Sequence, residues 1–132
     1  MKPRVWVLRL DERPWTFNSL RSAQHWTINA RRTAKWRVAF CALAMEAQIP
    51  SDARPVEITV TPFLATRRGL QDTAACVPAA KAAIDGLCDG ARWVTMRGTP
   101  DDGPGRVVRI IFEAPVCGAG DGLEIKITEL AE

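Results

Sequence analysis

The stretch from residue 67 to residue 102 decides the fold and contains most of the candidate site. It begins RRGLQDTAACVPAAKAAIDGL over residues 67–87 and, after a short connection, continues TPDDGP over residues 99–104. Pro78 has no backbone N–H to donate, so it is tolerated only in the first turn of a helix. We therefore predict a helix that starts near residue 75 or 77 and that Gly86 and Gly90 bring to an end near Asp89.

Hydrophobic periodicity predicts the elements on either side of this stretch. A half-buried strand alternates apolar and polar residues, whereas a helix repeats its apolar face every three or four residues. The predicted elements are strands at 5–10, 56–64, 106–112 and 123–130, and a helix from about residue 27 to residue 48. Residues 93–96 fit either a short strand or a packed loop.

Individual residues refine these predictions. Thr27 or Asn29 is expected to cap the first turn of the earlier helix, because a side-chain oxygen can accept a free first-turn N–H. Pro62 cannot donate to a sheet ladder, which favours an edge position or a strand end. The turn at 118–122 predicts that the strands at 106–112 and 123–130 pair antiparallel.

The predicted order is β-α-β-α-β-β, an α+β fold (an α/β sandwich) with two helices packed on a small mixed sheet. A chain of 132 residues fits a single domain, residues 1–132. No apolar run approaches the roughly 20 residues that span a bilayer, and the N-terminus has no secretory signal pattern. These features predict a cytoplasmic protein with no membrane partner, whose four cysteines are reduced thiols.

Positive charge is concentrated in the first half of the chain. Residues 1–70 carry 12 Lys or Arg and 5 acids, whereas residues 71–132 carry 6 and 10. No acid stands between Arg13 and Met45. A basic stretch beside an acidic cluster suits a polyanion held near a metal ion, although a solvated helix face has the same composition.

The acidic cluster is the candidate chemical site. Asp72 precedes the predicted helix, Lys81 and Asp85 lie one turn apart on it, and Asp101 and Asp102 follow in a turn. Mg²⁺ prefers carboxylate and water oxygens, and a lysine is a compact charge able to reach a phosphate oxygen. The set therefore fits metal-dependent phosphodiester hydrolysis.

Each of these residues also has an ordinary structural interpretation. Lys81 and Asp85 form a common i,i+4 pair. Asp72 is in position to cap the helix, and Asp-Asp before Gly-Pro is a frequent turn. The sequence contains no P-loop or Ser-His-Asp pattern and gives no basis for a nucleotide cofactor.

In this order, the acidic cluster resembles that of the RusA family of Holliday junction resolvases, in particular its phage relatives. The similarity covers most of the chain, from the Asn18 loop to the terminal strand at 123–129. It is tightest at the loop 67–72, at KAAIDGL over residues 81–87, and at the Asp101-Asp102 pair followed by a strand. The second of these looks like the family's Lys-x-x-x-Asp-x-Leu.

The resemblance implies a homodimeric endonuclease that uses Mg²⁺ or Mn²⁺ to cut four-way DNA junctions in a bacterial or phage-infected cell. It implies Asp72, Lys81 and Asp102 as catalytic residues and Asp72, Asp85, Asp101 and Asp102 as metal ligands. The expected DNA contacts are Asn18, Arg21, His25, Arg31, Arg32, Lys35, Arg67 and Arg68. A surface or packing role is the alternative for His25.

The chain departs from the family pattern at one position. The family usually shows Asp-x-Asp-Asn before the helix, whereas here only Asp72 stands and Leu70 or Gly69 occupies the other acidic position. Extra residues near 73–77 also separate Asp72 from Lys81. The alternatives are therefore a branched-DNA-binding protein of the same fold with impaired catalysis, or an interaction module whose charges are only surface.

Overall fold

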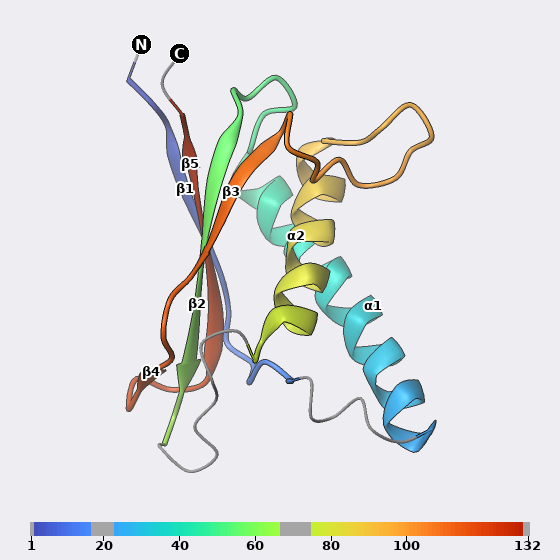
Figure 1. Ribbon diagram of the computed structural model, residues 1–132, viewed down its shortest axis with the longest axis vertical. Coiled ribbons are helices and arrows are strands. Elements are labelled where there is room, and N and C mark those ends of the chain that lie inside the picture. The colour runs from blue at the N-terminus through green and yellow to red at the C-terminus, as the bar shows by residue number, and fades with distance from the viewer. Residues whose placement is uncertain (1, 17–22, 67–74, 131–132) are drawn as a thin grey trace.

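The structure is a computed structural model that describes residues 2–16, 23–66 and 75–130, with the side chains of its first helix described from Thr27 onward. Its elements are β1 (Val5–Leu10), α1 (Ala23–Glu46), β2 (Val56–Leu64), α2 (Val77–Ala91), β3 (Val107–Phe112), β4 (Val116–Cys117) and β5 (Gly122–Glu129). The fold is α+β, with two helices on a mixed five-stranded sheet (Figure 1). This confirms the predicted element order, to which the structure adds the two-residue β4.

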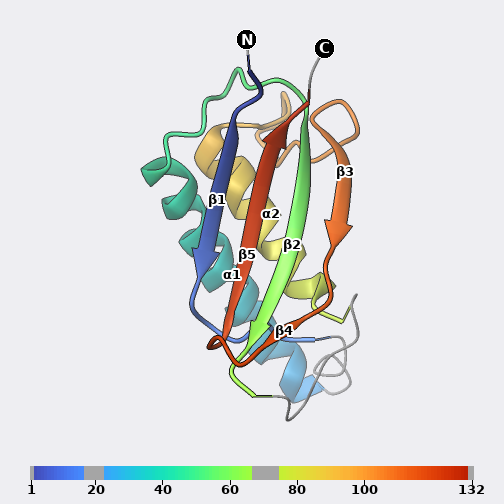
Figure 2. The ribbon, with the colours of Figure 1, turned by 90° about the vertical axis from the view of Figure 1, so that its left-hand side faces the viewer.

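The strand order in the sheet is β1-β5-β2-β3, with β4 continuing the β3 edge beside β2. β5 pairs antiparallel with β1 and with β2, whereas β3 and β4 pair parallel with β2 (Figure 2). The predicted antiparallel pairing of the last two long strands is therefore wrong, because β2 lies between them. The turn between β4 and β5 passes over the end of β2, because these two strands lie on opposite sides of β2. It therefore spans two strand spacings, or about 9.6 Å.

Pro62 lies inside the central strand β2, opposite Leu123, so the prediction of an edge position or strand end is also wrong. The carbonyls of Val60 and Leu64 accept N–H groups from the β3–β4 edge, those of Glu113 and Gly118, each at 2.9 Å. Backbone groups alternate sides along a strand, so the nitrogen of Pro62 faces this same edge. It falls between the end of β3 and the start of β4, where its missing N–H costs no ladder bond.

The core lies between the two helices and one face of the sheet. Ile58 and Val60 of β2 and Ile125 and Ile127 of β5 are fully buried there, against Phe40 of α1. The opposite face is open, as Figure 2 shows with the strands in front and both helices behind. Among the described residues, no helix has the length and apolar character needed to cross a membrane.

α1 begins at Ala23, before its predicted start near Thr27, and ends at Glu46. Thr27 and Asn29 consequently lie inside the helix, and neither caps it as predicted. Asn29 is buried, and its side-chain oxygen accepts a hydrogen bond from Arg32 at 3.4 Å.

α2 runs through Gly86 and Gly90 to Ala91, so the prediction that these glycines end the helix is wrong. They allow close packing instead. A Cβ at Gly86 would overlap the carbonyl oxygen of Arg37 in α1, and a Cβ at Gly90 would lie 2.8 Å from the Ala44 Cβ. The residue that caps the end of the helix is Arg92, which adopts the left-handed conformation at φ 61°.

Residues 93–96 form neither the short strand nor the packed loop that were predicted. Only Trp93 is buried, the other three residues are exposed, and Val94 forms an isolated bridge with Pro100. All four cysteines are free, as predicted. Burial raises the pKa of the Cys76 thiol to about 11, so this cysteine behaves as a small apolar group.

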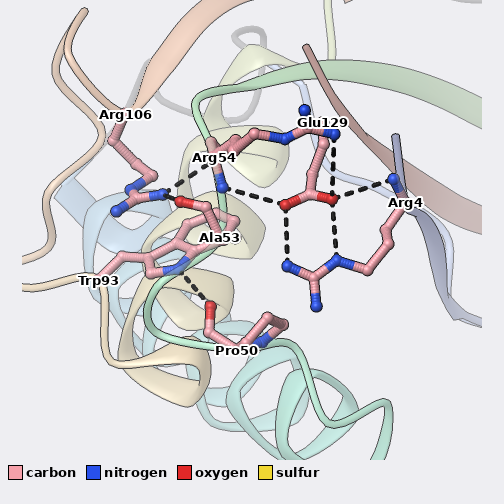
Figure 3. Close-up of polar contacts among 7 residues, drawn as sticks. All are labelled: Arg4, Pro50, Ala53, Arg54, Trp93, Arg106 and Glu129. Atoms are coloured by element: carbon pink, nitrogen blue, oxygen red, sulfur yellow. Dashed lines mark hydrogen bonds and ion pairs between the residues drawn. The ribbon is translucent and has the colours of Figure 1, made fainter. Parts of the chain in front are cut away.

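A buried carboxylate joins three distant segments of the chain (Figure 3). Glu129, at the end of β5, has a side chain only 1% exposed. It accepts hydrogen bonds from Nε and Nη2 of Arg4 at 2.9 and 3.0 Å and from the backbone N–H groups of Arg4 and Arg54, each at 3.0 Å. The hydrogen bond from the Arg4 side chain is the main cause that lowers the pKa of Glu129 to about 2.

We predict that Gly86→Ala destabilises the protein by about 1–3 kcal/mol, because the added methyl group forces the helices apart. The sign is diagnostic, since alanine is intrinsically the better helix former by about 1 kcal/mol. Urea unfolding followed by circular dichroism measures the change. Gly105→Ala is the matched control, because nothing lies within 4 Å of its added Cβ. Equal or greater stability of Gly86→Ala would rule out the close contact.

We predict that Glu129→Gln lowers the free energy of unfolding at pH 7 by about 2 kcal/mol, because charge-assisted hydrogen bonds are lost. The folded pKa lies below the ordinary value of 4.5, so the stabilisation is fully present above pH 4.5 and is lost as the pH falls towards 2. The variant should therefore show a shallower loss of stability in this window. Glu124→Gln, on the open face of the same strand, is the control. Parallel pH profiles for wild type and Glu129→Gln would refute this role.

Candidate metal and phosphate site

Three predicted site residues meet at one point of the structure. The Lys81 ammonium lies 2.9 Å from Oδ1 of Asp85, one turn later on α2, and also donates to Oδ2 of Asp102 from the connection that follows α2. Lys81 is 56% exposed, whereas Asp85 and Asp102 are 20% and 30% exposed. The group is therefore open to solvent on its lysine side and partly desolvated on its carboxylate side.

The two elements that carry these residues are held by the core. Ala83, Ile84 and Leu87 bury one side of α2, which leaves Lys81 and Asp85 on the outer side. The Asp101 N–H donates to the Trp93 carbonyl at 2.8 Å, just before Asp102.

The turn that follows the acid pair is also fixed. The carbonyl of Gly103 accepts the N–H groups of Arg106 and Val107 at 2.9 and 2.8 Å, and Val107 begins β3. The acid pair is thus fixed between the end of α2 and the start of a sheet strand.

Asp101 belongs to the same charged group. Buried Cys88 reports this proximity, because its pKa is raised to about 12 first by burial and then by Asp102, Asp85 and Asp101, while Lys81 opposes the rise. Within residues 75–130, the Asp101 carboxylate has no ion pair of its own. From here on, the name acidic cluster is restricted to its described members, Lys81, Asp85, Asp101 and Asp102. Two of its carboxylates, those of Asp85 and Asp102, contact the Lys81 ammonium, and the three acids together outnumber the single cation.

Lys81 remains protonated in this setting. Partial burial disfavours its charged form, but the hydrogen bonds to Asp102 and Asp85 outweigh that effect and leave the pKa of Lys81 raised. At neutral pH the side chain therefore carries a full positive charge. Because Lys81 is the most exposed side chain of the three, it can also contact an incoming phosphate.

The acidic cluster brings two carboxylates to one ammonium, which is fewer donors than a complete protein metal site has. The described residues contain no group of three or more His, Cys, Asp or Glu side chains placed to hold a metal ion by themselves. Mg²⁺ does not need such a cage, since it is commonly held by one or two carboxylates together with water and substrate phosphate. Asp85 and Asp102 already share one cationic partner, and Asp101 adds a carboxylate beside them. The fourth predicted ligand, Asp72, lies outside the described residues.

No family model and no curated protein matches this chain.

The predicted DNA contacts are only partly described. Arg31, Arg32 and Lys35 are exposed on α1. Lys35 pairs with Glu12 at 2.8 Å while remaining 67% exposed. Asn18, Arg21, Arg67 and Arg68 lie outside the described residues, and for His25 only its place in α1 is described.

The contact between α1 and α2 places the basic residues of α1 at the same level along the helix pair as Lys81 of the acidic cluster. Gly86 lies on Arg37 and Gly90 lies on Cys41, so the two helices run in the same direction with a constant offset. Lys81 is five residues before Gly86, and Arg32 is five residues before Arg37, which places them at the same level along the pair. In Figure 1, the N-terminal end of α1 extends beyond the start of α2 and away from the sheet.

Two features of the site were missed from the sequence. Arg37, one of the basic residues in the acid-free stretch between Arg13 and Met45, forms an ion pair with Asp89 through two contacts of 2.6 and 3.1 Å and ties α1 to α2. The close helix contact itself was also missed. The four-residue spacing of Gly86 and Gly90 on a helix was the available signal, because it puts both glycines on one face.

Proposed function

We propose that this chain is a structure-selective endodeoxyribonuclease that resolves four-way DNA junctions by metal-dependent phosphodiester hydrolysis. The observation that carries the proposal is the Lys81 ammonium held between the carboxylates of Asp85 and Asp102, with Asp101 beside them. The sequence resemblance to the RusA family supports the same assignment, since its matching positions include these residues.

The roles of the residues follow from their charge and placement. Asp85, Asp101 and Asp102, with Asp72, would hold Mg²⁺ or Mn²⁺. When bound, the ion lowers the pKa of a water molecule and offsets charge on the reacting phosphate. Lys81 is a fixed positive charge that binds a phosphate oxygen and stabilises the charge that develops there. The carboxylates also orient the Lys81 ammonium, because both accept hydrogen bonds from it.

The DNA backbone is proposed to run along the N-terminal half of α1, where Arg31, Arg32 and Lys35 are exposed at the level of Lys81. Phosphate contacts of this kind position a duplex without reading its sequence. The proposal includes a homodimer, because paired cuts across a junction with two-fold symmetry need two active sites related in the same way.

A second candidate is a branched-DNA-binding protein of the same fold with impaired catalysis. Two observations favour it. Between β2 and α2 the sequence has a single acid, Asp72, and the described acids form no complete metal cage. Junction binding without cleavage in either Mg²⁺ or Mn²⁺ would establish this candidate over the nuclease.

We predict that Asp102→Asn abolishes cleavage of a labelled four-way junction in Mg²⁺ and keeps or tightens binding. Asparagine preserves the shape of the side chain but removes a metal-binding charge and a charge that repels phosphate. Lys81→Ala should instead lose both cleavage and part of the binding. Gel assays of cleavage and of binding in EDTA separate the two effects.

The matched control for this series is Asp11→Asn, which removes an exposed carboxylate at the end of β1, where it pairs with Arg9. It should cut at the wild-type rate. Normal cleavage by Asp102→Asn would show that the Asp101-Asp102 turn is not part of the site.

We predict that junction affinity falls steeply with salt, with log K falling by about 0.9 per contacted phosphate for each unit of log[salt]. Arg31→Ala and Arg32→Ala should each reduce this slope by about 1. Lys126→Ala removes the same charge from the open sheet face and should leave the slope unchanged. Fluorescence anisotropy across a salt series measures it, and a salt-independent affinity would be incompatible with DNA contacts on α1.

A further inference from the structure

A short hairpin leads directly into the acid pair of the candidate site. Trp93 and Asp101 form its base, where the Asp101 N–H donates to the Trp93 carbonyl at 2.8 Å. Thr95 and Thr99 form the next hydrogen-bonded pair, through a backbone contact of 2.8 Å and a contact of 2.7 Å between their hydroxyls. We name residues 93–101 the hairpin.

The tip of the hairpin is closed as well. Gly98 has a φ of 79°, a conformation that glycine adopts at no steric cost. Its N–H returns to the Thr95 carbonyl at 2.9 Å. Hydrogen bonds at base, middle and tip give the hairpin one defined shape.

The base of the hairpin is fixed in the core (Figure 3). Trp93 is 2% exposed, and its indole N–H donates to the Pro50 carbonyl at 3.0 Å. The Arg106 guanidinium covers the ring at 5.0 Å from its centroid. The hairpin therefore projects from a rigid base, and its second strand delivers Asp101 and Asp102 to the acidic cluster.

The tip presents an apolar side chain next to a cation. Met96 has a relative exposure of 108%, the highest among the large hydrophobic residues that the structure describes. Arg97 follows it and is exposed. Within the described ranges, the Arg97 guanidinium contacts no carboxylate. An unpaired cation and an uncovered thioether on a rigid support match a ligand that is both anionic and apolar.

The position of the tip relative to the acid pair is set by the hairpin. Met96 stands three residues beyond the Trp93–Asp101 pair, which is about 10 Å at the rise of a strand. Stacked nucleotides rise 3.4 Å each along a strand. A phosphate at the acidic cluster would therefore place the tip about three nucleotides away.

We propose that the hairpin is a wedge that recognises the branch point of a DNA junction, with Met96 inserted against an unstacked base and Arg97 on a neighbouring phosphate. This proposal rests on the proposed function. Bases at a branch point lack a continuous stacking neighbour, so separating them costs less than in a linear duplex. Apolar side chains including methionine act as wedges between bases, and the flexible thioether adapts to an irregular gap.

The test uses a four-way junction with the fluorescent base 2-aminopurine at the branch point, titrated with the full-length protein in EDTA. Unstacking raises 2-aminopurine fluorescence. Wild-type protein should raise the signal, whereas Met96→Ser should abolish the rise and weaken junction binding by about tenfold, the loss expected when one methionine is no longer buried. Binding to a linear duplex should not change.

Met45→Ser is the matched control, since Met45 is a methionine on α1 with 64% exposure, and it should behave as wild type. Arg97→Ala should reduce the salt slope of binding by about 1 and leave the fluorescence rise in place. Thermal melting confirms that both hairpin variants fold.

The outcomes separate the wedge from the nuclease. A wild-type protein that binds and cuts junctions, with Met96→Ser giving the same fluorescence rise and affinity, overturns the wedge and leaves the proposed function standing. A wild-type protein that binds no junction overturns both.

Discussion

The contact of α2 with the backbone of α1 is the constraint on which the candidate site depends. Gly86 and Gly90 bring the two helices so close that a single methyl group at either position would overlap α1. The partly exposed ion pair between Arg37 and Asp89 links the two helices beside this contact. Because α2 cannot rotate or slide without breaking these contacts, the direction of Lys81 and Asp85 is set by packing in the core.

The acidic cluster places charge where stability alone gives no reason for it. Two carboxylates contact one lysine, and a third, that of Asp101, acts with them on the nearby buried thiol of Cys88. A surface ion pair contributes at most about 1 kcal/mol. By contrast, Glu129 is fully matched, with two arginines and two backbone N–H groups around one carboxylate. The acidic cluster has excess negative charge, whereas the charges around Glu129 are balanced. This difference marks the acidic cluster as the candidate functional site and the Glu129 network as a structural one.

Local patterns predicted most of the fold, and long-range packing accounts for the failures. Alternation in residues 56–64 and 123–130 correctly predicted β2 and β5, but it carries no information about which strand lies between them. The sequence around Gly86 and Gly90 looks the same whether these glycines end a helix or allow a neighbouring helix to pack closely. The difference lies in Arg37 and Cys41, almost fifty residues earlier in the chain.

The candidate site could be predicted only as far as residue chemistry reaches. The spacing of Lys81 and Asp85 already implied one helix face, and Asp102 was predicted for the same site. The structure shows its contact with Lys81, which depends on the hairpin between Trp93 and Asp101. That hairpin has no strong strand pattern, because its hydrogen bonds involve backbone groups and two threonine hydroxyls. Its exposed tip also leaves no periodic apolar signal in the sequence.

The central claim is that the acidic cluster binds a divalent cation. Crystals grown with Mn²⁺ and measured near the manganese absorption edge test it most directly, because the anomalous signal locates the ion independently of any activity. The account predicts a peak at the carboxylate oxygens of the acidic cluster. Lys81 still bridging both carboxylates at saturating Mn²⁺, with no peak at the cluster, would contradict it.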